Sequence, residues 1–515
     1  MKARRVSMVD EYKKYDTLLG TISATVSATA MLVGVHHYYR KQRQPDAELK
    51  DYLVGLGAQA RLLSTTNIPR LQYTFQQAKK GYQHYDVDGC EMQMSQNDRS
   101  TDLLARHTKT IISRPVCWVS GVASMPKKIN FDRHYNGTVN QNNNDSGMDF
   151  GVVGIDADRQ IVWQTTMPER VHDIVVQPFS HSADELVNAS DSHNDSCNHE
   201  RDVVVMGRRP SEQFWVLDTA TGQVKTTITA SENRHFYGHA CYSLDGSLLY
   251  VTENDTVSLN GKVGIYDVSS AYKKIAEFDS HGIGPHELIM HPDAETLIVA
   301  NGGIKTEQAS REELNLDTMR PSLVYLNRHT GQLLEQITPE HNQMSVRHLA
   351  MHDDGTVVIG VQFQGEKHIN VPLVLTHKRG DAEFAPLTMP NNQWQRFHQY
   401  IASVAVDSEH DLLCVTTPIG GCAAVYDLNT RKLIDGVDLP DCAGASVLLD
   451  KVSGKSTSDK VGFIVSDGQG QLTALEVKAL SHAESSDGES FDKNSIVLPN
   501  SKGHAMSFDN HLQTL

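Results

Sequence analysis

The chain has 515 residues, of which 39% are hydrophobic and only 7% aromatic, and its formal net charge is −16 at pH 7. The length allows a substantial core, and one large domain would use most of it. The negative charge argues against nucleic acid or an acidic membrane surface as a partner, because either would call for a basic face. The seven Cys show no CxxC spacing and are odd in number, which argues against a zinc knuckle, a thioredoxin-like motif and a disulfide framework.

The N-terminus has the pattern of an export signal or a membrane anchor. An uncharged run over residues 17–35 lies between basic residues on both sides, and residues 28–30 are small enough for signal-peptide cleavage. The run is just long enough to span a bilayer. We expect residues 1–35 to be an export signal or transmembrane anchor, and the protein to be periplasmic or tethered to the inner membrane. A helix of a cytoplasmic protein is the alternative.

The next segment, residues 36–112, differs from both neighbours. Its apolar residues have helix-compatible spacing and no strand–turn–strand rhythm, so we expect a partly helical linker. Residues 113–515 are expected to form the main domain. Polar insertions within it, such as 180–200, are expected to be exposed loops between strands.

A loosely repeated unit fills this main domain. A His, or a small residue in its place, precedes an apolar run, a polar turn and a second apolar strand; the copies begin at His172, His239, His286, His348, Ser403, Ala445 and His504. A third strand, usually ending in Asp or Asn, can be counted seven times, at 151–156, 214–222, 263–270, 322–331, 372–380, 423–430 and 472–479. Such units predict an all-β fold, a seven-bladed β-propeller of the YVTN/WD40-like kind.

The first unit has no inner strand before it. The segment that follows His504 can supply this strand from the other end of the chain, which would close the ring and remove the open sheet edges. The sequence therefore predicts a propeller closed by its C-terminal strand.

In a propeller blade the inner strand begins at the rim where the second strand ends, because the two strands are antiparallel. This rim would gather five imidazoles, from His172, His239, His286, His348 and His504. Imidazoles that converge on one axis are good ligands for a transition metal, and we expect iron or copper. Nearby polar groups would orient them or bind the metal complex, and the candidates are Glu253, Asn254, Glu287, Asn301 and Arg320. Arg320 belongs to a long charged loop that could cover the rim, although ion pairs within the loop are the plainer explanation.

The His have a structural interpretation as well. In WD repeats a Gly-His dipeptide ties a loop to a neighbouring strand, and Gly238-His239 and Gly503-His504 are similar. Here the His directly precedes the apolar run, which brings it closer to the axis. Metal binding and structural capping both remain open on the sequence.

Several runs resemble the DUF1513 family, which consists of bacterial proteins that look like YVTN-type propellers and usually carry export signals. The runs are 280–288, 300–306, 314–326, 345–350 and 508–512, and the resemblance extends from about Val116 to the C-terminus. The family's usual company of imelysin-like and di-haem peroxidase-like proteins implies a link to iron acquisition. This chain departs from the family in its weak export signal, its segment 36–112 and its enlarged polar loops.

The leading hypothesis is an exported propeller that binds a transition metal or metal complex at an axial His rim, in periplasmic iron or copper handling. A second is a redox or lactonase-like enzyme that uses the same rim, with Glu253 or Glu287 as acid or base. A third is a scaffold whose rim binds a periplasmic protein partner and whose His are structural. Because propellers support many unrelated activities, the fold does not choose among them.

Overall fold

The computed structural model describes residues 115–126, 148–179, 201–209, 211–306, 313–449, 460–479 and 495–515. All of them lie in the unit Lys109–Leu515. The expected anchor, 1–35, and the expected linker, 36–112, lie outside the described residues, and so do the polar insertion 180–200 and part of the long loop after Asn301. No helix within the described ranges is long and apolar enough to cross a membrane.

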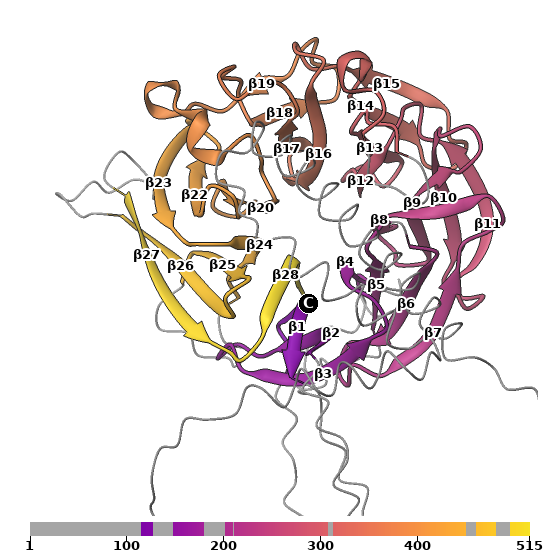
Figure 1. Cartoon of the computed structure of the whole chain (residues 1–515), viewed down its shortest axis with the longest axis horizontal. Helices are drawn as coiled ribbons and strands as arrows, with labels where there is room; N and C mark the ends of the chain where they lie inside the picture. Colours follow the sequence, from indigo (N-terminus) through magenta and orange to yellow (C-terminus); the bar gives the residue numbers. More distant parts are fainter. Residues whose placement is uncertain are drawn as a thin grey trace, which may run out of the picture. The chain divides into compact units, whose positions relative to one another are not determined.

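Seven four-stranded antiparallel sheets surround one axis (Figure 1). We number these blades I to VII and give the strands of each from the axis outward. Blade I contains β28 (Ser507–Thr514), β1 (Trp118–Pro126), β2 (Met148–Ile155) and β3 (Ile161–Met167). Blade II contains β4 (Val171–Val176), β5 (Asp202–Gly207), β6 (Gln213–Asp218) and β7 (Val224–Thr229). Blade III contains β8 (Arg234–Tyr242), β9 (Leu248–Asp255), β10 (Gly261–Asp267) and β11 (Lys273–Asp279).

The remaining blades repeat this order. Blade IV contains β12 (Pro285–Met290), β13 (Thr296–Asn301), β14 (Ser322–Asn327) and β15 (Leu333–Ile337). Blade V contains β16 (Met344–Met351), β17 (Thr356–Phe363), β18 (Val374–Lys378) and β19 (Ala385–Pro386). Blade VI contains β20 (Ser403–Asp407), β21 (Leu412–Thr417), β22 (Cys422–Asp427) and β23 (Lys432–Asp438). Blade VII contains β24 (Cys442–Val447), β25 (Gly462–Asp467), β26 (Gln471–Ala479) and β27 (Ser495–Gly503). The helical elements of the described residues are three short 3₁₀ turns, η1 (Leu316–Thr318), η2 (Pro390–Asn392) and η3 (Trp394–Phe397).

The predicted seven-bladed propeller is confirmed, and so is its closure. Strand β28 pairs with β1, from Trp118 opposite Thr514 to Ser124 opposite Ser507, and becomes the innermost strand of blade I. In Figure 1 the yellow β28 lies beside the indigo β1 near the centre of the ring. Pairing of the last strand with the first removes an open sheet edge that would otherwise recruit another chain.

The hydrophobic core lies between neighbouring blades. Middle strands such as β13 are buried at every residue, because each face packs against another blade, whereas the outermost β7 and β15 have mostly exposed or half-buried residues. The largest apolar cluster joins blades IV, V and VI and contains Tyr325 and Tyr426, both fully buried. Burial on both faces explains why the middle strands are continuous apolar runs in the sequence.

The Asp or Asn that ends most third strands has a local role. The Asp218 carboxylate accepts a hydrogen bond from the backbone N–H of Thr221 (2.8 Å), and the Asn327 side-chain oxygen accepts one from Thr330 N–H (3.0 Å). Asp427 does the same for Thr430 N–H (2.9 Å). These are Asx turns, in which the side chain satisfies backbone donors that the sheet leaves unpaired.

Candidate metal centre

Five imidazoles converge on the propeller axis. They come from the inner strands of blades II, III, IV, V and I, as His172, His239, His286, His348 and His511. The ring centroids of His239 and His286 are 4.6 Å apart, those of His286 and His348 are 4.9 Å apart, and those of His239 and His511 are 5.0 Å apart. Blades VI and VII contribute no His to this cluster, and their small residues Ser403 and Ala445 line the cavity beside it.

β-Bulges in the inner strands set the direction of these His side chains. Six of the seven inner strands, all except β20, have a shift in their pairing register with the second strand of the blade. His286 is the extra residue between Pro285 and Glu287 in β12, and His239 lies in the interruption between Phe236 and Ala240 in β8. A bulge leaves a residue out of the ladder and re-aims its side chain, which regular pleating would not do.

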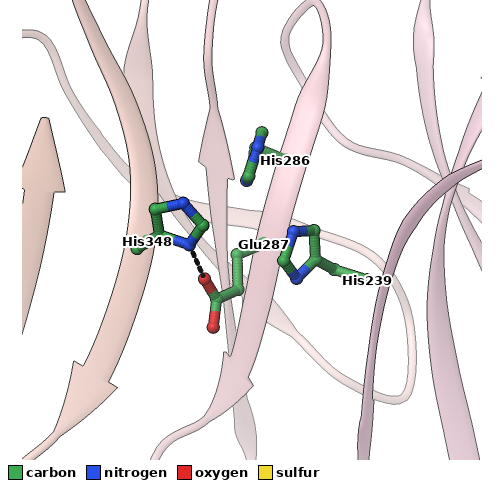
Figure 2. Close-up of side chains that lie close together, drawn as sticks. All are labelled: His239, His286, Glu287 and His348. Carbon is green, nitrogen blue, oxygen red and sulfur yellow. Dashed lines mark hydrogen bonds and ion pairs between the residues drawn. The ribbon is translucent and has the colours of Figure 1, made fainter. Parts of the chain in front are cut away.

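Several imidazole nitrogens in the cluster have no hydrogen-bond partner among the described residues. They are Nε2 of His348 and His511, Nδ1 of His286 and both ring nitrogens of His239, all buried. A buried polar atom without a partner costs roughly 1–3 kcal/mol. Several such atoms in one cluster therefore call for an explanation, such as a bound ligand. Figure 2 shows the rings of His239, His286 and His348 gathered around Glu287.

Two carboxylates orient the rings in the same way. Glu287 Oε2 accepts a hydrogen bond from Leu349 N–H (3.1 Å) and lies 3.1 Å from Nδ1 of His348, the contact dashed in Figure 2. Asp173 Oδ2 accepts a bond from Ala240 N–H (3.4 Å) and lies 3.2 Å from Nδ1 of His239. In both cases a carboxylate of one blade lies beside Nδ1 of the next blade's His, as a hydrogen bond at His348 and as an ion-pair contact at His239, and Nε2 remains available for a ligand.

Two overlapping sets of side chains have the spacing of metal ligands. The first contains His239, His286, Glu287 and His348, and the second contains His172, His239 and His511. Within each set the ligand atoms lie within 4.8 Å of one another. We call the first set the axial site.

Burial keeps most of these imidazoles neutral. It lowers the pKa of His172, His286 and His348 well below the ordinary value, and the neighbouring His239 lowers it further. Burial also lowers the pKa of His511, to about 4. Burial would lower the pKa of His239 too, but the Asp173 carboxylate outweighs it and raises this pKa. Burial raises the pKa of Glu287 to about 7. Neutral imidazole is the form that binds a metal ion.

A cavity of about 430 Å³ continues from the His cluster along the axis. Asp173, Glu287, His348 and His511 line it together with Ser403 and Ala445. It is large enough for a small ligand, and its carboxylates give it an acidic end beside the imidazoles.

A protein-family match covers most of the residues that build this centre. Residues 191–515 match the family described as "Protein of unknown function (DUF1513)". The chain belongs to the DUF1513 family. The match includes four of the five clustered His and leaves out His172. No curated protein matches this DUF1513 chain.

One solved structure similar to it is titled Kuenenia stuttgartiensis Hydrazine Synthase. The two share 13% sequence identity with a TM-score of 0.43, and the similarity covers 62% of this DUF1513 chain and 89% of the other. A likeness of this size carries no argument about function.

The structure brings together half of the ten residues that the sequence singled out. His172, His239, His286, His348 and Glu287 meet at the axis. His504 does not, because β27 continues to Gly503 and the inner strand of blade I begins only at Ser507. The ring of His504 instead lies 5.9 Å from that of Phe508, and His511 takes the place expected for it. The expected position of His504 in the ring is therefore corrected.

The other candidates of the DUF1513 chain lie outside both metal-ligand sets. Glu253 is fully buried within blade III, where it accepts a hydrogen bond from Tyr266 Oη (2.7 Å) and pairs with Lys274 Nζ (2.6 Å). Its neighbour Asn254 is buried in β9. Asn301 Nδ2 donates to the carbonyl oxygen of Ser280 (2.9 Å), which fixes the turn before β12, and Arg320 is exposed.

Sequence reasoning missed His511 and Asp173. His511 is followed by a single apolar residue and then by Gln513 and Thr514, so the criterion of a following apolar run passes over it. Asp173 lies inside an apolar strand directly after His172. The pairs His172-Asp173 and His286-Glu287 share one pattern, a His followed by a carboxylate at the start of an inner strand, and this was the available signal.

Proposed function

We propose that this protein binds one transition-metal ion in its axial site, with His239, His286 and His348 as nitrogen ligands and Glu287 beside them. The observation that carries the proposal is the convergence of buried, partnerless imidazole nitrogens whose neighbours are fixed by carboxylates. Because His239 belongs to both metal-ligand sets, one ion per chain is the expected stoichiometry.

The ligand set favours a borderline metal. Three imidazoles and a carboxylate suit iron, copper or zinc better than magnesium or calcium, which prefer oxygen ligands. We propose iron or copper handling as the setting and an exported, periplasmic protein as the context. The support is the uncharged run 17–35 between basic flanks and the company that DUF1513 members usually keep.

The first experiment is elemental analysis of full-length protein, purified without a metal-binding tag, followed by titration of the metal-free protein with Fe²⁺, Cu²⁺ and Zn²⁺. We expect about one ion per chain for the wild type. The double variant His239→Ala/His286→Ala should lose stoichiometric binding, because it removes two of the three nitrogen ligands of the axial site.

A matched control removes two imidazoles from the surface. His329 and His368 have side chains that are 51% and 77% exposed, and His329→Ala/His368→Ala should bind metal as the wild type does. A wild-type protein that takes up no ion would overturn the proposal. If His239→Ala then also lowers the free energy of unfolding, the scaffold interpretation with structural His would stand in its place.

A further inference from the structure

Two arginines lie at the rim where the inner strands begin, on the other side of the His from the cavity. Arg347 directly precedes His348 in β16, and Arg208 follows β5, whose end pairs with the start of β4 beside His172. Residues that precede the His in the inner strands face this rim, whereas residues that follow the His line the cavity.

Among the described residues, no carboxylate forms an ion pair with the Arg208 guanidinium, although the charge of Asp509 acts on it. The Arg208 backbone N–H donates to Arg170 O (2.9 Å), and no ion pair or hydrogen bond of its guanidinium is found among the described residues. The neighbouring carboxylate, Asp509, is engaged by Arg170 in a two-point ion pair (2.6 and 2.9 Å). Burial lowers the pKa of Arg208, so this guanidinium is partly desolvated.

Arg347 is in the same situation. It is the extra residue of the bulge between Val346 and His348, and its Nε donates to the hydroxyl of Ser345 (3.2 Å). Within the part of the chain that the structure describes, no carboxylate pairs with it. Because Arg347 directly precedes His348 in β16, its backbone lies next to a residue of the axial site.

Tyr400 lies at the same rim as the two arginines. It forms a backbone bridge with Gln362 at the rim end of blade V, and both Arg347 and Arg208 act on its pKa, which burial raises. Partly buried cations without an ion-pair partner are costly, and an anion that accepts bidentate hydrogen bonds from guanidinium groups would offset that cost. Tyr400 adds a hydroxyl donor at the same place.

The two sides of the imidazole cluster thus differ in charge. Asp173 and Glu287 face the cavity and attract a bare cation, whereas Arg208 and Arg347 repel one at the rim. An ion that reaches the imidazoles from the rim therefore requires an anionic companion.

We propose that the rim formed by Arg208, Arg347 and Tyr400 binds a small carboxylate anion, so that the metal is taken as its carboxylate chelate. This inference rests on the proposed metal site. It adds that the metal ion is bound together with a carboxylate anion. The imidazoles would hold the ion, and the arginines would hold the carboxylates that point away from it.

The test is a calorimetric titration of malonate into the full-length protein, once metal-free and once loaded with Zn²⁺, which is redox-inert. We expect malonate to bind the Zn-loaded protein at least about ten-fold more tightly than the metal-free protein. The variant Arg208→Gln/Arg347→Gln should weaken malonate binding by roughly ten-fold or more, because it removes the charge-assisted hydrogen bonds to the carboxylates. The affinity for Zn²⁺ in malonate-free buffer should not fall.

The matched control is Arg379→Gln/Arg396→Gln, which changes the net charge equally. These guanidinium groups are 41% and 42% exposed and face Asp293 and Asp438 on the surface, so malonate binding should persist. Malonamide, the neutral analogue, should not bind the wild type, and this readout does not depend on any variant.

The outcomes separate the two proposals. If Zn²⁺ binds but malonate does not, or if malonate binds equally well to the Arg208/Arg347 variant, the anion site is overturned and the metal site stands. Malonate binding that Zn²⁺ leaves unchanged would also overturn the chelate. If Zn²⁺, Fe²⁺ and Cu²⁺ all fail to bind, the metal site falls, and the chelate falls with it.

Discussion

At the scale of single residues, Gly238 shows how closely the inner strands approach one another. Its φ is +112°, and a Cβ atom at this position would overlap Cδ2 of His172 on the neighbouring blade. Only glycine accepts both the positive φ and the contact. The residue before one ligand thus sets the position of another.

We therefore expect Gly238→Ala to lower the free energy of unfolding by about 1–3 kcal/mol, from backbone strain and overpacking together. Urea denaturation measures the change. Gly380→Ala is the control, because Gly380 also has a positive φ (+97°) but no atom would lie within 4 Å of the added Cβ. Equal losses in both variants would show that the contact with His172 contributes nothing.

Four of the five axial His could be predicted from the sequence, because each begins an apolar strand in a repeat that the sequence displays. Glu287 could be predicted from its place beside His286. The partnering of Asp173 with His239 could not, because it joins side chains from two blades 66 residues apart, and no local pattern records which blade follows which at the axis.

At the scale of elements, blade III has a charged network that crosses its strands. Arg234 forms a two-point contact with Glu277 (2.8 and 2.9 Å), and Lys274 contacts both Glu277 (2.8 Å) and the buried Glu253 (2.6 Å). The network ties β8, β9 and β11 together. It explains why Glu253 belongs to the blade and not to the axis.

This network predicts a pH dependence of stability. Burial would raise the pKa of Glu277, but hydrogen bonds from Arg234 and Lys274 outweigh it and lower the pKa to about 2. A folded-state pKa below the unfolded value, about 4.3, stabilises the fold above that value, and this contribution disappears as the pH falls towards 2.

We expect Glu277→Gln to flatten the change in unfolding free energy between about pH 4.5 and pH 2, measured by urea denaturation across that range. Glu366→Gln is the control, since Glu366 is 77% exposed and contacts only the similarly exposed His368. A wild-type pH profile for Glu277→Gln would contradict the role assigned to the pair. Solvent screening makes the effect smaller than the pKa shift alone implies.

The strands themselves could be predicted, since the apolar runs and Asx turns follow from pleating and turn chemistry. Their bulges could not. A bulge such as that at His286 adds one residue to a strand without a change in its apolar character, so the side-chain direction at the axis is set by packing between blades and not by alternation. For the same reason the sequence predicts that the inner strand of blade I begins at His504, whereas β28 begins at Ser507.

At the scale of the whole molecule, β28 completes both the ring of blades and the ring of imidazoles. Its contacts run to β1, β4 and β24, so it joins the first blade to its two neighbours. The number of blades and this closure could be predicted by counting third strands and noticing that the first unit lacked an inner one.

Deletion of residues 504–515 should therefore lower the thermal midpoint and cause aggregation, because β1 would present an unpaired edge. Differential scanning calorimetry and light scattering measure the two effects. A synthetic peptide of residues 504–515, added in trans, should restore both, and the same peptide with Phe508→Asp and Leu512→Asp should not, since both side chains are buried. A truncated protein as stable and as monomeric as the full chain would contradict the closure by β28.

The pairing of β28 with β1 also sets the order of events during synthesis. The hydroxyl of Ser120 reaches the carbonyl oxygen of His511, which follows it by 391 residues. When β1 leaves the ribosome, its inner neighbour has not yet been translated, and contacts of such sequence separation form slowly. Blade I therefore stays open until nearly all of the propeller has been made, and His511 is the last imidazole to arrive.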